Sequence, residues 1–147
     1  MVKPASPPGG DGDTHSINVP HDAVGARHAR QRLAAELELL VPATLRADVI
    51  AVAAELLGNA VRHASALPGD VIALRWRVDT DDSGTLVELQ VCDGGSTLEP
   101  RAGMAEPDAV GGRGLAIVSA LSRTWGYERG AAGQCVWARL RGPTLSP

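Results

Sequence analysis

The stretch ELLGNAVRHA, residues 55–64, places three polar side chains in a run that otherwise reads as a buried helix. Glu55, Asn59 and His63 are spaced by four residues, so on a helix they form a single stripe. Gly58 adds a residue that costs a helix interior about 1 kcal/mol relative to alanine. Taken alone, such a stripe is most often a solvated helix face, and the alternative is a binding surface at the edge of the core.

The residues around this stretch predict a helix over about 45–65. Pro42 precedes the helix, and Thr44 can cap its first turn. Apolar side chains recur at helical spacing beside the polar stripe, at Leu45, Val49, Val52, Leu56 and Ala60. The polar stripe therefore borders the apolar face of the helix rather than lying opposite to it.

Short alternating runs separated by turns predict the rest of the chain. We expect an edge strand at 15–19 and a helix over about 23–40 that is capped by Asp22. Further strands are predicted at 71–78, 85–92, 124–130 and 134–140, with a hairpin loop at 79–84 and a helix at 111–122. This order predicts an α+β two-layer sandwich, with a mostly antiparallel sheet and helices on one face.

Composition bounds the class of protein. The chain has 147 residues, enough for one domain with a core, and we expect this domain at 14–142 between a disordered tail at 1–13 and a C-terminal tail at 143–147. The net charge of −3, without a basic stripe or an aromatic platform, argues against direct nucleic-acid binding. No apolar run approaches the roughly 20 residues that span a bilayer, so no membrane segment is expected.

The start of the chain and its two cysteines bear on localisation. The first residues have no apolar core of a signal peptide. Cys92 and Cys135 fall in separate predicted strands and show no spacing typical of a metal site or a disulfide. We therefore expect two reduced structural thiols in a cytoplasmic protein.

Two further motifs carry chemistry. In VCDGG, residues 91–95, Asp93 directly follows an apolar strand and can accept a hydrogen bond from a ligand amino group, while Gly95 lets a flat ring approach the backbone. In GGRGLAIV, residues 111–118, glycines lead into a helix whose free N–H groups and dipole favour an anion such as phosphate. Each motif alone also fits an ordinary turn or helix start.

The three motifs together resemble a known family. A helix with Glu and Asn is followed, after roughly thirty residues, by a strand ending in Asp-x-Gly, then by a long loop and a Gly-x-Gly helix start. In this order the chain resembles the GHKL (Bergerat-fold) ATPase superfamily over about residues 15–141. Within that superfamily it is most similar to the small stand-alone anti-sigma-factor serine kinases and their actinobacterial relatives.

The resemblance implies roles for residues of the first two motifs. Glu55 matches the acidic residue that polarises the attacking hydroxyl, and Asn59 matches the asparagine whose side-chain oxygen holds Mg²⁺. Asp93 matches the aspartate that receives the adenine amino group. Gly95 matches the glycine beneath the adenine ring.

The resemblance also implies a phosphate site and a mobile ATP lid. The phosphate-binding residues would be Gly112, Arg113, Gly114 and Leu115. Residues 96–110, which have no usable periodicity, match the lid. Thr97 stands where the family often has a further glycine, and Arg62 and His63 match a basic pair common in this branch, for which we expect a structural or electrostatic role.

The function implied is that of an ATP-binding anti-sigma factor that acts as a serine/threonine protein kinase, with ATP and Mg²⁺ as cofactors. Its expected partners are a sigma factor and an antagonist protein that it phosphorylates, and a homodimer is compatible with the family. A non-catalytic module that binds ATP and sequesters a partner is the main alternative. Two further alternatives are disfavoured. The catalytic half of a histidine kinase would be expected to follow dimerisation helices. An ATPase that uses hydrolysis to drive a conformational change usually needs a longer chain.

Overall fold

The computed structural model describes residues 14–95 and 112–144 as three helices and five strands. The helices are α1 (Ala23–Leu37), α2 (Ala43–His63) and α3 (Gly112–Leu121). The strands are β1 (Thr14–Pro20), β2 (Val71–Asp81), β3 (Gly84–Asp93), β4 (Thr124–Gly130) and β5 (Gly133–Gly142). The element order is the one that the sequence predicts.

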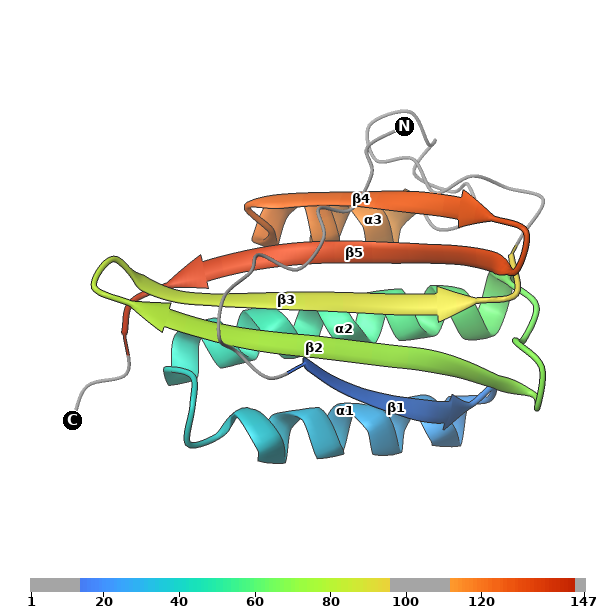
Figure 1. Cartoon of the computed structure of the whole chain (residues 1–147), viewed down its shortest axis with the longest axis horizontal. Coiled ribbons are helices and arrows are strands. Elements are labelled where there is room, and N and C mark those ends of the chain that lie inside the picture. The colour runs from blue at the N-terminus through green and yellow to red at the C-terminus, as the bar shows by residue number, and fades with distance from the viewer. Residues whose placement is uncertain (1–13, 96–111, 145–147) are drawn as a thin grey trace.

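The strands form one sheet in the order β1-β2-β3-β5-β4, and every neighbouring pair is antiparallel. Figure 1 shows the three helices behind one face of this sheet, with α1 near the β1 edge and α3 near the β4 edge. Helix α2 packs between α1 and α3 and against β3 and β5. The predicted α+β two-layer sandwich, with β1 at its edge, is confirmed.

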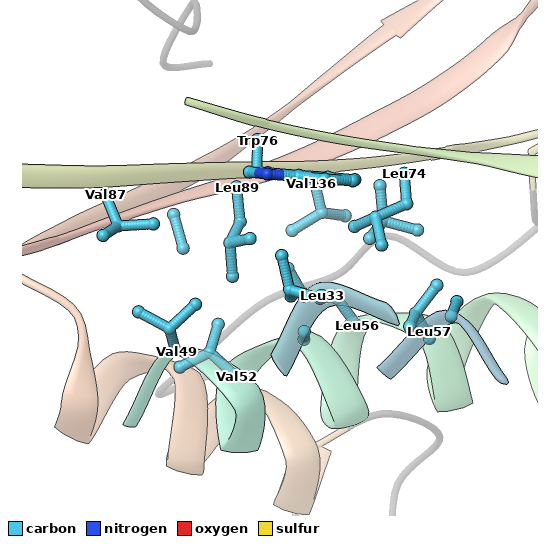
Figure 2. Close-up of a cluster of buried hydrophobic side chains, with 14 of the residues drawn as sticks. Leu33, Val49, Val52, Leu56, Leu57, Leu74, Trp76, Val87, Leu89 and Val136 are labelled. Carbon is cyan, nitrogen blue, oxygen red and sulfur yellow. The ribbon is translucent and has the colours of Figure 1, made fainter. Parts of the chain in front are cut away.

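The core lies between the sheet and α2, as Figure 2 shows. Val49, Val52 and Leu56 of α2 are buried and face Val87 and Leu89 of β3. Because the apolar residues of β2, β3 and β5 alternate, each strand directs one set of side chains to the helices and the other set away from them. No helix in the described parts of the chain is both long and apolar enough to cross a membrane.

Several element ends differ from the predicted ones. Asp22 caps α1 as predicted, accepting a hydrogen bond of 2.6 Å from the Gly25 amide, but the helix ends at Leu37 because the residues after it form a turn. Helix α2 begins at Ala43, so Thr44 lies inside it and the capping position falls to Pro42, which has no side-chain hydrogen bond to offer. The hairpin loop predicted at 79–84 shrinks to residues 82–83, because β2 and β3 remain paired to Asp81 and Gly84.

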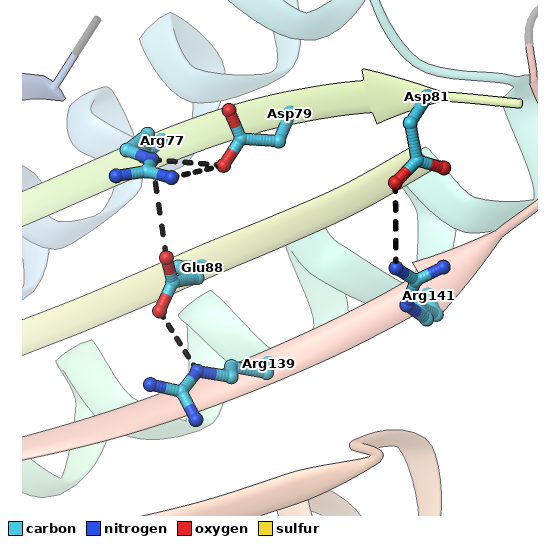
Figure 3. A network of polar contacts seen from close by, with 6 residues as sticks. All are labelled: Arg77, Asp79, Asp81, Glu88, Arg139 and Arg141. Carbon is cyan, nitrogen blue, oxygen red and sulfur yellow. Dashed lines mark hydrogen bonds and ion pairs between the residues drawn. The ribbon is translucent and has the colours of Figure 1, made fainter. Parts of the chain in front are cut away.

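The face of the sheet away from the helices carries a polar ladder, made of Arg77, Glu88 and Arg139 on β2, β3 and β5 (Figure 3). Glu88 Oε2 accepts a hydrogen bond of 2.8 Å from Arg139 Nε, and Glu88 Oε1 lies 3.9 Å from Arg77 Nε. Arg77 also pairs with Asp79. The ladder thus ties together three neighbouring strands.

Cys92 and Cys135 form a disulfide on the same side of the sheet as this ladder. The prediction of two reduced thiols is therefore wrong. The antiparallel register places Cys92 of β3 directly opposite Cys135 of β5, with their Cα atoms 4.0 Å apart. The spacing of 43 residues gives no hint of this pairing, because β5 inserts between β3 and β4 in the sheet.

Candidate functional site

The polar stripe of α2 lies where the sequence predicts it, at the border of the core. Glu55, Asn59 and His63 are all half-buried, whereas Leu56 and Ala60 beside them are buried. Asn59 Oδ1 accepts a hydrogen bond of 3.3 Å from Nη2 of Arg62, which is exposed. Burial and the neighbouring Arg62 charge lower the pKa of His63, so its imidazole is held toward the neutral form.

The residues that follow β3 are hydrogen-bonded to the end of α2. The Gly94 amide donates to the Ser65 carbonyl at 2.7 Å, and the Ser65 amide donates to the Gly95 carbonyl at 3.0 Å. This pair of hydrogen bonds joins the Asp-Gly-Gly motif to the chain that directly follows the polar stripe. Two motifs that lie some thirty residues apart in the sequence therefore meet in the fold.

Two glycines make this junction possible. A Cβ at Gly94 would lie 2.3 Å from the Ala66 carbonyl oxygen, and a Cβ at Gly133 would lie 2.0 Å from the Asp93 carbonyl oxygen. Both contacts are with backbone, which cannot move aside as a flexible side chain would. Gly133, at a φ of +141°, also adopts a backbone conformation that side chains disfavour. Only glycine fits at these positions, and the sequence analysis did not single out either of them for the site.

Asp93 is buried at the end of β3, with 4% of its surface exposed. Its Oδ1 accepts a hydrogen bond of 2.7 Å from the Gly95 amide. Burial raises the pKa of this carboxyl, and the Gly95 amide, the Gln134 side chain and the charges of His21 and Arg129 oppose that rise. Because a carboxylate has about four acceptor positions, these hydrogen bonds leave Asp93 capacity for a further donor.

Two residues near Asp93, Gln134 and His21, were not predicted from the sequence. Gln134 lies opposite Asp93 in the β3–β5 register and donates a hydrogen bond to its carboxylate. His21 Nε2 lies 2.9 Å from the carbonyl oxygens of both Ala60 and Ala64, so a single proton on Nε2 is shared between two carbonyl groups near the end of α2. Gln134 can be assigned to the site only once the order of the strands is known. His21 stands alone before the helix cap Asp22, and no sequence pattern marks it as part of a site.

The glycine-rich motif forms the start of α3, as predicted. Gly112 opens the helix, Arg113 and Gly114 follow in its first turn, and Leu115 is buried at 2% exposure. Helix α3 packs against α2, so its first turn and the polar stripe belong to adjacent helices. The first N–H groups of a helix have no partner within the helix. The predicted lid at 96–110, including Thr97, lies outside the described residues.

Comparisons with known proteins identify the fold and the family of the chain. The crystal structure of the RsbU and RsbW domains of Rv1364c from Mycobacterium tuberculosis is similar to this chain, with a TM-score of 0.63 and 22% sequence identity. The match covers 92% of this chain and 33% of that one, so the present chain spans about a third of its structural neighbour. No curated protein sequence matches the chain. The family model of the histidine kinase-like ATPase domain matches residues 19–140, and the chain therefore belongs to that family.

Proposed function

We propose that the chain binds ATP with Mg²⁺ and transfers the γ-phosphate to a serine or threonine of a partner protein. Its partners would be a sigma factor, which it holds inactive, and an antagonist protein, which it phosphorylates. The chain would act in the cytoplasm. The observation that carries the proposal is the junction of Asp93 with the end of α2, which brings an acidic acceptor beside the helix that carries Glu55 and Asn59.

Asp93 would recognise the adenine ring. The Gly95 amide and the Gln134 side chain already donate to its carboxylate, and the remaining acceptor capacity would take a hydrogen from the adenine amino group. Guanine presents a carbonyl oxygen at the same position of the ring. Two facing acceptors leave a buried group unpaired, at a cost of about 1–3 kcal/mol. The site would therefore prefer ATP and ADP to GTP by about tenfold to hundredfold.

Asn59 would supply the protein ligand to Mg²⁺. Its amide oxygen is the type of donor that this hard cation prefers, and Mg²⁺ bound to a nucleotide needs only one or two protein ligands beside phosphates and waters. The oxygen lies on an exposed part of α2, where it accepts a hydrogen bond from Arg62. When bound, the metal would neutralise phosphate charge during transfer.

The first turn of α3 would hold phosphate oxygens through its backbone N–H groups, from Gly112 to Leu115. Glu55 lies one helical turn before Asn59 on the same stripe, and it would orient the hydroxyl of the partner and accept its proton. A carboxylate at this position is not required for binding a nucleotide alone. Its presence favours an enzyme over a module that only sequesters a partner.

Thermal unfolding with added nucleotide tests the proposal. In the presence of Mg²⁺, ATP and ADP should raise the melting temperature through linkage to the native state, and GTP should raise it far less. The matched variant is Asp93→Asn. The Gly95 amide would hold the amide oxygen of the new side chain, and its NH₂ group can only donate where the carboxylate accepted, so the preference for adenine should narrow or reverse.

Equal stabilisation of the wild-type protein by ATP and GTP would contradict the role given to Asp93. No stabilisation by any nucleotide would contradict the proposed function as a whole. If ATP binds but no partner captured from cell extract gains phosphate, the sequestering module is the correct interpretation.

A further inference from the structure

Gly58 has no role in the proposed nucleotide site. It lies in the interior of α2, and its φ is not in the left-handed region, so the backbone does not require a glycine. A Cβ built at this position would lie 2.7 Å from Arg62 Nη1 and 3.3 Å from Cζ and Nη2 of the same side chain. Apart from the adjoining residues and the backbone of α2 itself, these three atoms are the nearest to it. The space that the glycine leaves is therefore occupied by the guanidinium group of Arg62.

The folded-back guanidinium group contacts the proposed metal ligand. Arg62 Nη2 donates to Asn59 Oδ1 at 3.3 Å, along an exposed stretch of α2. A glycine in a helix interior costs more stability than an exposed pair at a spacing of three residues returns. The arrangement is thus not explained by the stability of α2. It does place a positive charge on the one oxygen to which the proposed function assigns Mg²⁺.

We propose that Arg62 is a positioning residue that holds the Asn59 side-chain oxygen in the ligand-free protein, and that Mg²⁺ with its nucleotide must displace it. Gly58 provides the space that this resting position of Arg62 requires. The inference rests on the proposed function, because it presumes that Asn59 binds Mg²⁺. Two cations that share one oxygen repel each other, so the metal and the guanidinium group compete, although water at this exposed position weakens the repulsion.

Two substitutions remove Arg62 from Asn59 by different routes. Arg62→Ala removes the guanidinium group, and Gly58→Ala displaces it while the charge stays on the chain. Both should lower the Mg²⁺ concentration at which ADP binding is half-maximal, by about two- to fivefold, the range expected for an exposed interaction of this kind. The double variant should match Arg62→Ala alone, because both changes remove the same contact.

Arg32→Ala is the matched control, since it removes an exposed arginine on α1. It should leave the Mg²⁺ requirement unchanged. A readout that needs no ligand is the side-chain amide signal of Asn59 in nuclear magnetic resonance spectra, which should shift in Arg62→Ala and in Gly58→Ala but not in Arg32→Ala. Gly58→Ala should also unfold at a higher temperature than the wild-type protein.

The possible outcomes separate this inference from the proposed function. If wild-type protein binds ADP in a Mg²⁺-dependent way but neither variant changes the Mg²⁺ requirement, the displacement of Arg62 is wrong and the proposed function stands. If only Arg62→Ala changes it, the effect is one of net charge and the inference is overturned. If wild-type protein shows no Mg²⁺-dependent binding of ADP, the proposed function and this inference both fail.

Discussion

The polar ladder on the outer face of the sheet and the polar stripe on α2 use similar side chains in different ways. In the ladder, Glu88 lies between two arginines, and Arg77 is only 5% exposed. In the stripe, Asn59 has one long hydrogen bond to an exposed arginine, and Glu55 is half-buried. The ladder groups form ion pairs across three strands, although Glu88 Oε1 accepts no hydrogen bond from the described residues, whereas the stripe groups keep capacity for a ligand.

This difference indicates a division of labour between the two regions. A charged group that is paired across neighbouring strands stabilises one register, because removing one partner leaves a charge without compensation. A polar group that is half-buried and weakly paired can exchange its partner at little cost. The outer face should therefore respond to mutation through stability, and the α2 stripe should respond through binding and transfer.

Reduction of the disulfide should produce the largest loss of stability. Cys92 and Cys135 lie on the outer face and close a loop of 43 residues. Reduction, or the change of both cysteines to serine, should lower the free energy of unfolding by about 2–4 kcal/mol. Denaturant unfolding with and without a dithiol reductant measures this loss. The double serine variant should no longer respond to the reductant, and an unchanged stability of the reduced wild-type protein would contradict the structural role.

Glu55→Gln should affect transfer and leave stability intact. The change keeps the size and helix propensity of the side chain and removes its charge. Transfer to a partner should fall by about 10²-fold or more, which corresponds to ~2.7 kcal/mol, while nucleotide affinity stays within a few-fold. Single-turnover transfer from ATP to a partner captured from cell extract gives the rate.

Glu36→Gln is the control for this change, because Glu36 is an exposed carboxylate on α1. It should transfer phosphate at the wild-type rate. Wild-type transfer by Glu55→Gln would mean that Glu55 is an ordinary surface residue, and that the mechanism proposed for the kinase is wrong.

Glu88→Gln should lower stability and leave nucleotide binding intact, which is the opposite of the result expected for Glu55→Gln, and its effect should be smaller. The change weakens the ion pairs with Arg139 and Arg77, so the free energy of unfolding should fall by about 1–2 kcal/mol. The affinity for ADP should not change, since the ladder lies on the far side of the sheet from the helices. Unfolding and ADP binding measured on the same sample would test both statements, and a loss of affinity without a loss of stability would refute the division of labour.

The candidate site was predicted from the sequence only where the signal is local. The stripe of Glu55 and Asn59 follows from a spacing of four on a helix, and Asp93 follows from its place at the end of an apolar strand. Their roles came from the resemblance to a family and not from these patterns. Gln134 and His21 could not be found in this way, because their partners lie 41 and at least 39 residues away along the chain.

The sequence by itself determined the order and type of the elements, because helical and strand periodicities are set by neighbours within a few residues. Only the tertiary structure decided that β5 lies between β3 and β4. That order pairs Cys92 with Cys135 and Asp93 with Gln134, so it created both the disulfide and the surroundings of the proposed adenine acceptor. The order of the strands depends on how the apolar faces of all the strands pack together against the helices. This packing is a property of the whole core, and no local stretch of sequence encodes it.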